Sequence, residues 1–455
     1  MLHIVEREGI VMKLEENKNI GLQETSFPSK HRRRAGILST LLMGLGQFYN
    51  KDWIKGIFYL LIEVVVIANY AYFRHGLWGI ITLGEVPGAH NDHSIVLMIK
   101  GIIAILILLI ALVIYILNIR DAWSTGKLRD QNQEVPSFRK YIDELWEKSF
   151  PYLMLSPAVL GIMFFILLPI LFGVFIAFTN YSMPNYIPPK NLVNWVGFTN
   201  FINIFKMPMW GDTFFGIAAW NLIFAITATT LNFFGGLLIA ILINSKYVRF
   251  KRFWRTFYML PYAVPALISQ LIFRNIFNGQ FGPLNIALKN WGIIQNNIPW
   301  FSHPTVAKIT ILMVNVWLGF PYFMILMTGT MTSISKEIYE ASDIDGASSR
   351  QKFSSITLPM VLYSTAPLLI MSFAHNFNNF GLIYFLTDGG PTGKYPAGSG
   401  AGATDILISW VYKLTLNNQQ YHMASVVSII IFIVIGSIAA YNFTRTRSFK
   451  EDKML

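Results

Sequence analysis

Cysteine is absent from the sequence, and charged residues are scarce. The lack of cysteine excludes disulfide bonds, cysteine-ligated metals and thiol catalysis. Charged residues make up 13% of the chain, whereas a typical soluble domain carries roughly 25%. Hydrophobic residues account for 54%, and the mean hydropathy is +0.47. These values indicate a membrane protein.

Several apolar runs are long enough to cross a bilayer as helices. A hydrocarbon core of roughly 30 Å needs about 20 apolar residues, and only helices or closed barrels satisfy the backbone there. The sequence therefore predicts an all-α polytopic membrane protein with about eight transmembrane helices, near 56–73, 95–117, 152–179, 216–243, 256–277, 305–331, 358–386 and 422–443. A shorter, glycine-rich apolar segment at 35–49 is expected to dip into the membrane or pack at its surface.

Basic residues are distributed unevenly between the two sides that these spans define. With both termini in the cytoplasm, 25 of the 36 Lys and Arg residues fall on the cytoplasmic side and 6 in the outer loops. The positive-inside rule therefore predicts this orientation in a bacterial cell membrane. The same distribution accounts for the net charge of +12, which disfavours a nucleic-acid partner.

The predicted spans divide the chain into four regions. These are a disordered cytoplasmic tail at 1–34, an accessory membrane region at 35–150, a main transmembrane domain at 151–447 and a cytoplasmic tail at 448–455. No apolar region with a small-residue cleavage site directly follows the first tail, so it is not interpreted as a signal peptide. Within the accessory region, 120–150 is expected to form an amphipathic linker at the membrane surface.

The sequence lacks the motifs of an enzyme or an ATPase. The nearest match to a Walker A motif, at 389–394, is one residue short between its glycines, continues with Tyr395 and lies in an outer loop. The histidines show no metal-ligand spacing, and no catalytic constellation is present. We therefore expect no catalytic residue, metal or cofactor, and energy supplied by another subunit. Glu63, which lies deep in a span, is interpreted as a structural hydrogen-bond acceptor, with a proton relay as the alternative.

A polar stretch at 340–359 lies between two long apolar segments, on the predicted cytoplasmic side. Its pattern predicts two short helices separated by a turn at Gly346, with Pro359 ending or redirecting the second helix. Small residues let another surface approach closely, and Arg350 and Lys352 are expected to be free for solvent or an acidic partner. The alternative interpretation is an ordinary cytoplasmic loop.

Three spans carry polar and aromatic residues at membrane depth, where such groups cost free energy unless they find partners. The clusters lie at 260–266, where two prolines break backbone hydrogen bonding, at 315–322 and at 372–381. Amides and hydroxyls hydrogen-bond to hydroxyl groups, while aromatic faces stack on sugar rings. Together the clusters indicate a path for a sugar, although each one taken alone could serve helix packing.

The stretch at 340–359 resembles the EAA loop of binding-protein-dependent ABC importers, with Ser342 in place of the usual alanine. Residues 150–447 as a whole are similar to the MalF-type permease subunits of maltose/maltodextrin ABC importers. The motifs that carry this similarity also include 260–265, 317–322, 376–380 and 389–391. The resemblance implies a type I ABC importer permease fold, with coupling helices within 333–359, that imports maltodextrin-type oligosaccharides by alternating access.

The resemblance also implies two sets of functional residues. Those expected to couple to an ATPase are Glu340, Ala341, Asp345, Gly346, Ala347 and Phe353. Those expected to bind the sugar are Tyr262, Asn315, Leu318, Gly319, Tyr322, Ser372, His375 and Asn376. The implied partners are a second, MalG-like permease subunit, an ABC ATPase dimer, a lipid-anchored extracytoplasmic sugar-binding protein, the oligosaccharide and membrane lipids.

Three departures from the family pattern bear on the substrate and the receptor. His375 stands where the family has Phe, and Ala266 stands where it has Ser, which alters one stacking surface and one hydroxyl. The outer loop at 181–215 is much shorter than in enterobacterial members, which suits a membrane-tethered receptor. The alternatives are the same importer for a galacto-oligosaccharide, an ion-coupled secondary carrier, and a membrane scaffold without a transport role.

Overall fold

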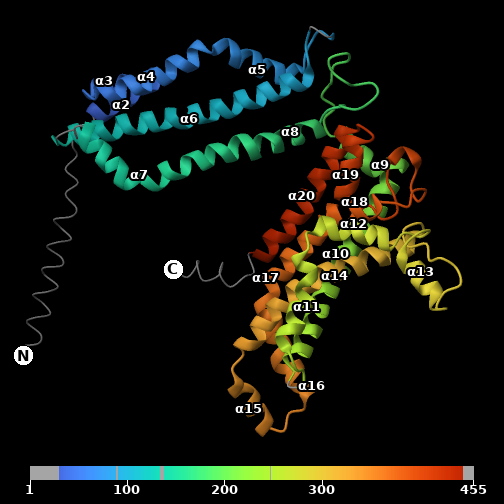
Figure 1. The fold of residues 1–455 in the computed structure, drawn as a ribbon. Helices are drawn as coiled ribbons and strands as arrows, with labels where there is room; N and C mark the ends of the chain where they lie inside the picture. Colours follow the sequence, from blue (N-terminus) through green and yellow to red (C-terminus); the bar gives the residue numbers. More distant parts are fainter. Residues whose placement is uncertain (1–29, 89–90, 134–137, 246, 444–455) are drawn as a thin grey trace, which may run out of the picture. The chain divides into compact units, whose positions relative to one another are not determined.

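The computed structural model describes residues 30–88, 91–133, 138–245 and 247–443. The predicted tails at 1–29 and 448–455, and the linker side chains from 138 to 149, lie outside the described residues. The chain divides into two compact units, Met1–Phe172 and Gly173–Leu455, whose helices are labelled in Figure 1.

Both units are helical. The helices of the first unit are α2 (Lys30–Leu41), α3 (Leu45–Tyr49), α4 (Trp53–Ala68), α5 (Tyr70–Thr82), α6 (Ser94–Asp130) and α7 (Phe138–Gly161), followed by a π-helical turn (Ile162–Leu167). Helix α8 (Leu168–Ala177) leads into the second unit. That unit continues with α9 (Thr199–Lys206), α10 (Pro208–Asn244), α11 (Lys251–Ala263), α12 (Ala266–Ile276), α13 (Pro283–Asn290), α14 (Pro304–Ser333), α15 (Lys336–Ile344), α16 (Ser349–Lys352), a π-helical turn (Phe353–Thr357), α17 (Leu358–Phe377), α18 (Phe380–Thr387), α19 (Leu407–Leu416) and α20 (Tyr421–Phe443).

Six of the described helical segments are each long and apolar enough to cross a membrane, and the number rises to as many as eight if each of two bent helix pairs is one span. The bent pairs are α4 with α5, at 54°, and α11 with α12, at 89°. This pattern confirms the predicted all-α class with about eight spans.

The first helix begins earlier than the sequence indicates. Residues 30–34, assigned above to a disordered tail, form the first turns of α2. The carboxylate of Asp130 at the end of α6 accepts hydrogen bonds from the backbone N–H groups of His31 and Arg32, at 2.8 and 3.1 Å. Because the first N–H groups of a helix need an outside partner, this long-range contact stabilises a helix that the local sequence does not specify.

The first predicted span is a bent pair rather than one straight helix. Helix α4 ends at Ala68, and the side-chain amide of Asn69 donates to the carbonyl of Val65 at the break. Deeper in α4, the carboxylate of Glu63 accepts a hydrogen bond from the backbone N–H of Met43, between α2 and α3. Glu63 thus makes the hydrogen bond expected of a structural acceptor.

The second unit contains a sharper break where prolines interrupt the chain. Helix α11 ends at Ala263, and α12 begins at Ala266, directly after Pro265. Proline has no N–H group and disfavours helical geometry at the preceding residue, which explains the 89° bend. The predicted interruption of this span is confirmed at Pro265, but Pro261 lies inside α11 and does not break it.

The polar stretch of the second unit forms two short helices, α15 and α16, at the opposite end of the unit from α9 and α19 (Figure 1). Gly346 lies between them with a φ of 74°, a left-handed conformation that favours glycine. Two expectations are wrong here. Helical backbone continues through Pro359, because the π-helical turn before it leads into α17, where proline occupies the first turn. Lys352 is not free, since the turn brings its ammonium to the carboxylate of Asp343.

The loop before α19 is organised around a buried ion pair. The carboxylate of Asp405 accepts from the ammonium of Lys413 at 2.8 Å and from the backbone N–H of Gly402 at 2.7 Å. A Cβ at Gly389 would lie 1.9 Å from the same carboxylate, so the loop wraps closely around it. Burial raises the pKa of Asp405, and the positive charge of Lys413 opposes that rise.

Candidate functional site: a polar cavity in the second unit

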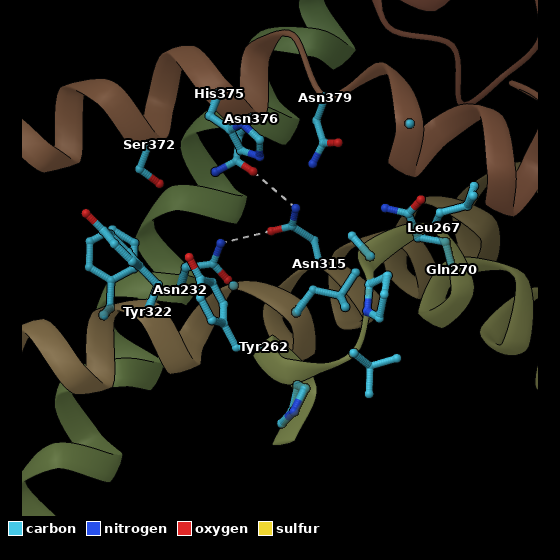
Figure 2. A pocket seen from close by; sticks show the side chains of 18 of the residues that line it. Asn232, Tyr262, Leu267, Gln270, Asn315, Tyr322, Ser372, His375, Asn376 and Asn379 are labelled. Carbon is cyan, nitrogen blue, oxygen red and sulfur yellow. Dashed lines mark hydrogen bonds between the residues drawn. The ribbon is translucent and has the colours of Figure 1, made fainter. Parts of the chain in front are cut away.

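A cavity of about 820 Å³ lies in the second unit, where the α11–α12 break faces α14 and the α17–α18 junction (Figure 2). The break exposes the turn around Val264, helix α14 contributes its middle section, and α17 contributes its last turns. The volume falls within the roughly 300–1,000 Å³ of small-ligand sites. The two irregular junctions are therefore the features that open space between the helices.

All eight residues that the resemblance assigns to sugar binding line this one cavity. Tyr262 comes from α11, and Ser372, His375 and Asn376 come from α17; those from α14 are Asn315, Leu318, Gly319 and Tyr322. The side chains of Tyr262 and Tyr322 are 60% and 39% exposed, so both rings are accessible to a ligand. The chain thus brings three sequence clusters, separated by some fifty residues each, to a common wall.

Three further polar residues of the cavity were not among those assigned to the sugar. They are Asn232 on α10, Gln270 on α12 and Asn379 between α17 and α18 (Figure 2). Asn232 follows Thr229 and Thr230 in a largely apolar span, and polar groups at membrane depth were the available signal. Asn379 belongs to the cluster at 372–381, whereas Gln270 lies outside the three clusters and only the fold places it at the cavity.

Asparagine amides form a hydrogen-bonded chain across the cavity wall. The amide nitrogen of Asn232 donates to the side-chain oxygen of Asn315 at 3.0 Å, and the nitrogen of Asn315 donates to the oxygen of Asn376 at 3.1 Å. Asn376 in turn donates to the hydroxyl of Thr229 on α10, at 3.0 Å. All three amides are at least 95% buried. The chain links α10, α14 and α17, so the polar clusters serve helix packing as well as lining the cavity.

Gly319 permits the close approach on which this chain depends. A Cβ at this position would lie 2.4 Å from the amide nitrogen of Asn232. The side-chain oxygen of Asn232 is buried without a hydrogen-bond partner among the described residues. A buried acceptor of this kind normally finds a partner, and a ligand hydroxyl in the cavity can supply one.

The cavity wall has few groups that can carry charge. None of its described lining residues is Asp, Glu, Lys or Arg, and one of them is His375. Amides, hydroxyls, aromatic rings and one imidazole suit an uncharged polyhydroxyl ligand.

The residues expected to couple to an ATPase lie together on the polar stretch. Glu340 and Ala341 of α15 are exposed, as are Asp345 and Gly346 at the turn, and Ala347 is half-buried. Phe353 instead packs against the hydrophobic cluster that contains Phe233 and Phe323. The phenol oxygen of Tyr339 and the hydroxyl of Thr357 are 2.8 Å apart and join α15 to the base of α17. The exposed surface is thus connected to the helix that carries Ser372, His375 and Asn376.

These features define a multi-pass membrane protein with a polar cavity between its helices and an exposed helical loop at one end. Residues 232–448 match the family described as binding-protein-dependent transport system inner membrane components. The chain belongs to this family of transport subunits, because two permease proteins that are 41% and 39% identical to it align with 92% and 94% of its length.

Both of these relatives come from Bacillus subtilis. The galactooligosaccharides transport system permease protein GanP is 41% identical over 92% of this chain and 99% of its own length. The maltodextrin transport system permease protein MdxF is 39% identical over 94% of this chain and 98% of its own. The maltose/maltodextrin permease protein MalF of Klebsiella aerogenes is 38% identical over 55% of this chain and 49% of its own length.

A solved structure supports the fold. A chain of the bacterial ABC transporter for import of the acidic polysaccharide alginate matches with a TM-score of 0.54 and 21% identity, over 66% of this chain and 96% of that chain. This likeness confirms the ABC importer permease fold.

Proposed function

We propose that this chain is a permease subunit of an ATP-driven importer that moves maltodextrin-type oligosaccharides across the cell membrane. The observation that carries the proposal is the cavity of about 820 Å³, whose described wall lacks Asp, Glu, Lys and Arg and is lined by amides and accessible tyrosine rings. The names of MdxF and MalF support maltodextrin as the substrate. The similarity to GanP makes a galacto-oligosaccharide the second candidate, since both sugars offer the same hydroxyl-rich rings.

In this proposal the cavity holds the sugar weakly at mid-membrane. Tyr262 and Tyr322 provide ring faces for stacking, and Ser372, His375 and the free oxygen of Asn232 provide hydrogen-bonding groups. The asparagine chain orients these groups because each amide is held by its neighbour. Weak binding through several contacts suits a transport protein, because the protein must release the sugar that it binds.

The energy would come from a separate ATPase dimer that binds the exposed face of α15 and the turn at Gly346. Closure of that dimer would move α15, and the contact between Tyr339 and Thr357 would carry the motion to α17. Helix α17 bears three of the proposed sugar ligands, so the movement would open the cavity to the cytoplasm. A second permease subunit would complete the path, and a lipid-anchored binding protein would deliver sugar from outside. The predicted orientation, with both termini and the polar stretch in the cytoplasm, is part of this proposal.

The test is purification of the detergent-solubilised chain from its native membrane, with identification of its partners and an ATPase assay with binding protein and sugar. Recovery of a second permease and an ATPase, with hydrolysis stimulated by maltodextrin-loaded binding protein, supports the proposal. Stimulation by galacto-oligosaccharide alone would change the substrate. A chain that is recovered alone and transports sugar under an ion gradient would overturn the mechanism.

A further inference from the structure

The first unit contains a groove that the transport proposal does not use. It has a volume of about 690 Å³ and lies where α4 and α5 meet α6. Its long wall is one face of α5, on which Tyr70, Arg74, Trp78 and Ile81 follow one another at helical spacing, and Leu108 of α6 contributes the facing side. The wall is apolar and aromatic apart from a single cationic side chain.

The groove is built from tightly packed elements. Gly76 of α5 lies so close to α6 that a Cβ there would be 3.2 Å from the carbonyl oxygen of Lys100. On the facing helix α6, a Cβ at Gly101 would be 2.5 Å from the side chain of Ile80 on α5. The bend at Asn69 then turns α4 away from the axis of α5 by 54°. The groove is therefore a fixed feature of the bent pair and not a gap between mobile segments.

Arg74 lies in this groove without an ionic partner. Its side chain is exposed, and the described residues place no carboxylate within ion-pair distance of it. It belongs to the α4–α5 pair, which is apolar enough to count as one bent membrane span. An unpaired Arg in a membrane-crossing segment is costly unless it reaches the interface or finds a partner, and an anion beside Arg74 would lower that cost.

The surroundings of Arg74 favour a phospholipid as the source of that anion. The planar guanidinium donates two parallel hydrogen bonds to a phosphate. Tyr70 and Trp78, one turn to either side, are 65% and 58% exposed, and such amphipathic rings prefer the headgroup level of a bilayer. Ile81 and Leu108 extend the wall with side chains suited to an acyl chain. A phospholipid provides both the anionic phosphate and the acyl chain.

We propose that this groove is a binding site for an anionic phospholipid, with the headgroup phosphate on Arg74 and an acyl chain along α5. The site lies wholly within the first unit and does not depend on the sugar cavity. It would make the accessory region respond to the headgroup charge of the surrounding membrane.

The test counts the lipids that remain on the protein. The full chain, with the subunits that accompany it, is placed in nanodiscs of mixed phosphatidylglycerol and phosphatidylcholine, released into mild detergent and analysed by native mass spectrometry. Arg74→Gln should reduce retained phosphatidylglycerol about fivefold to tenfold, because one interfacial charge and its bidentate contact are lost. Lys100→Gln is the matched control, since Lys100 is also exposed and basic but does not line the groove. Its retention should equal that of the wild type.

A second variant distinguishes lipid binding in the groove from general electrostatic attraction of anionic lipid to Arg74. Leu108→Trp narrows the groove and leaves Arg74 in place, so it should also reduce retention. Equal retention by Arg74→Gln and the wild type would overturn the site, as would an equal loss in Lys100→Gln. An imaged complex with a partner helix or a second copy of this chain in the groove would assign it to protein docking instead. Sugar uptake is not the readout, so failure here leaves the transport proposal standing.

Discussion

Replacement of Gly319 by alanine tests the cavity wall with the smallest possible change. The new Cβ would lie 2.4 Å from the amide nitrogen of Asn232 and 2.7 Å from its Cγ, closer than real Cβ contacts occur. Because Asn232 is buried, its amide must move, and its 3.0 Å hydrogen bond to Asn315 is lost. A buried polar group left without its partner costs about 1–3 kcal/mol, which corresponds to about 5–150-fold in an equilibrium constant.

The assay is uptake of labelled maltodextrin by the assembled transporter in proteoliposomes. We expect Gly319→Ala to lower kcat/KM by about tenfold or more, mainly through a higher KM, because the displaced amide chain no longer orients the ligand-facing groups. Gly329→Ala is the control in the same helix, since a Cβ there meets no atom within 4 Å. Both variants gain about 1 kcal/mol of helix propensity, so a difference between them reports the contact with Asn232.

Two outcomes would refute this reasoning. Wild-type kinetics for Gly319→Ala would mean that the asparagine chain does not support the sugar site. Equal loss in Gly319→Ala and Gly329→Ala would mean that any extra methyl group on α14 impairs the transporter. A further double variant, Gly319→Ala with Asn232→Ala, removes the clash and should keep the protein assembled even if transport stays low.

Three other substitutions test separate parts of the structure. Gly346→Pro should abolish sugar uptake and sugar-stimulated ATPase activity while membrane insertion persists, because proline cannot adopt the φ of 74° and removes the N–H bonded to the carbonyl of Asp343. Asn376→Ala should lower sugar transport about tenfold without loss of ATPase assembly, because it breaks two links of the asparagine chain. Asp405→Asn should destabilise the loop before α19 by about 3–5 kcal/mol, since it leaves the buried ammonium of Lys413 uncompensated; faster proteolysis at 388–406 measures this.

Each of these substitutions has a matched control. Gly292 has a φ of 71° and open space around it, but lies in a loop predicted to be on the outer side, so Gly292→Pro should preserve ATPase coupling. Asn275 is exposed and bonds only within α12, so Asn275→Ala should transport normally. Asp388 is exposed, and Asp388→Asn should leave proteolysis unchanged. Normal transport by Gly346→Pro or Asn376→Ala, or a protease-resistant Asp405→Asn loop, would contradict the corresponding argument.

Membership in a class of protein could be predicted from the sequence because it rests on local patterns. Apolar runs of sufficient length specify membrane spans whatever their neighbours are, and the resulting all-α fold is confirmed. Pro265 interrupts a helix by its own geometry, so the α11–α12 break was also predictable, whereas Pro261 lies inside α11. The polar clusters on three spans stood out because polar groups at membrane depth are costly. Their convergence on one cavity is consistent with the sugar path inferred from them, whose function remains a prediction.

Contacts between distant residues were decided by the tertiary structure alone. Asn232 joins the cavity because Gly319, 87 positions later in the sequence, lets two helices approach. The first turns of α2 form because Asp130, nearly a hundred residues away, accepts their N–H groups. Lys352 is paired because a left-handed turn at Gly346 folds it back onto Asp343. Sequence patterns report what a segment prefers over a few turns, whereas the partners of buried polar groups depend on which helices pack together in space.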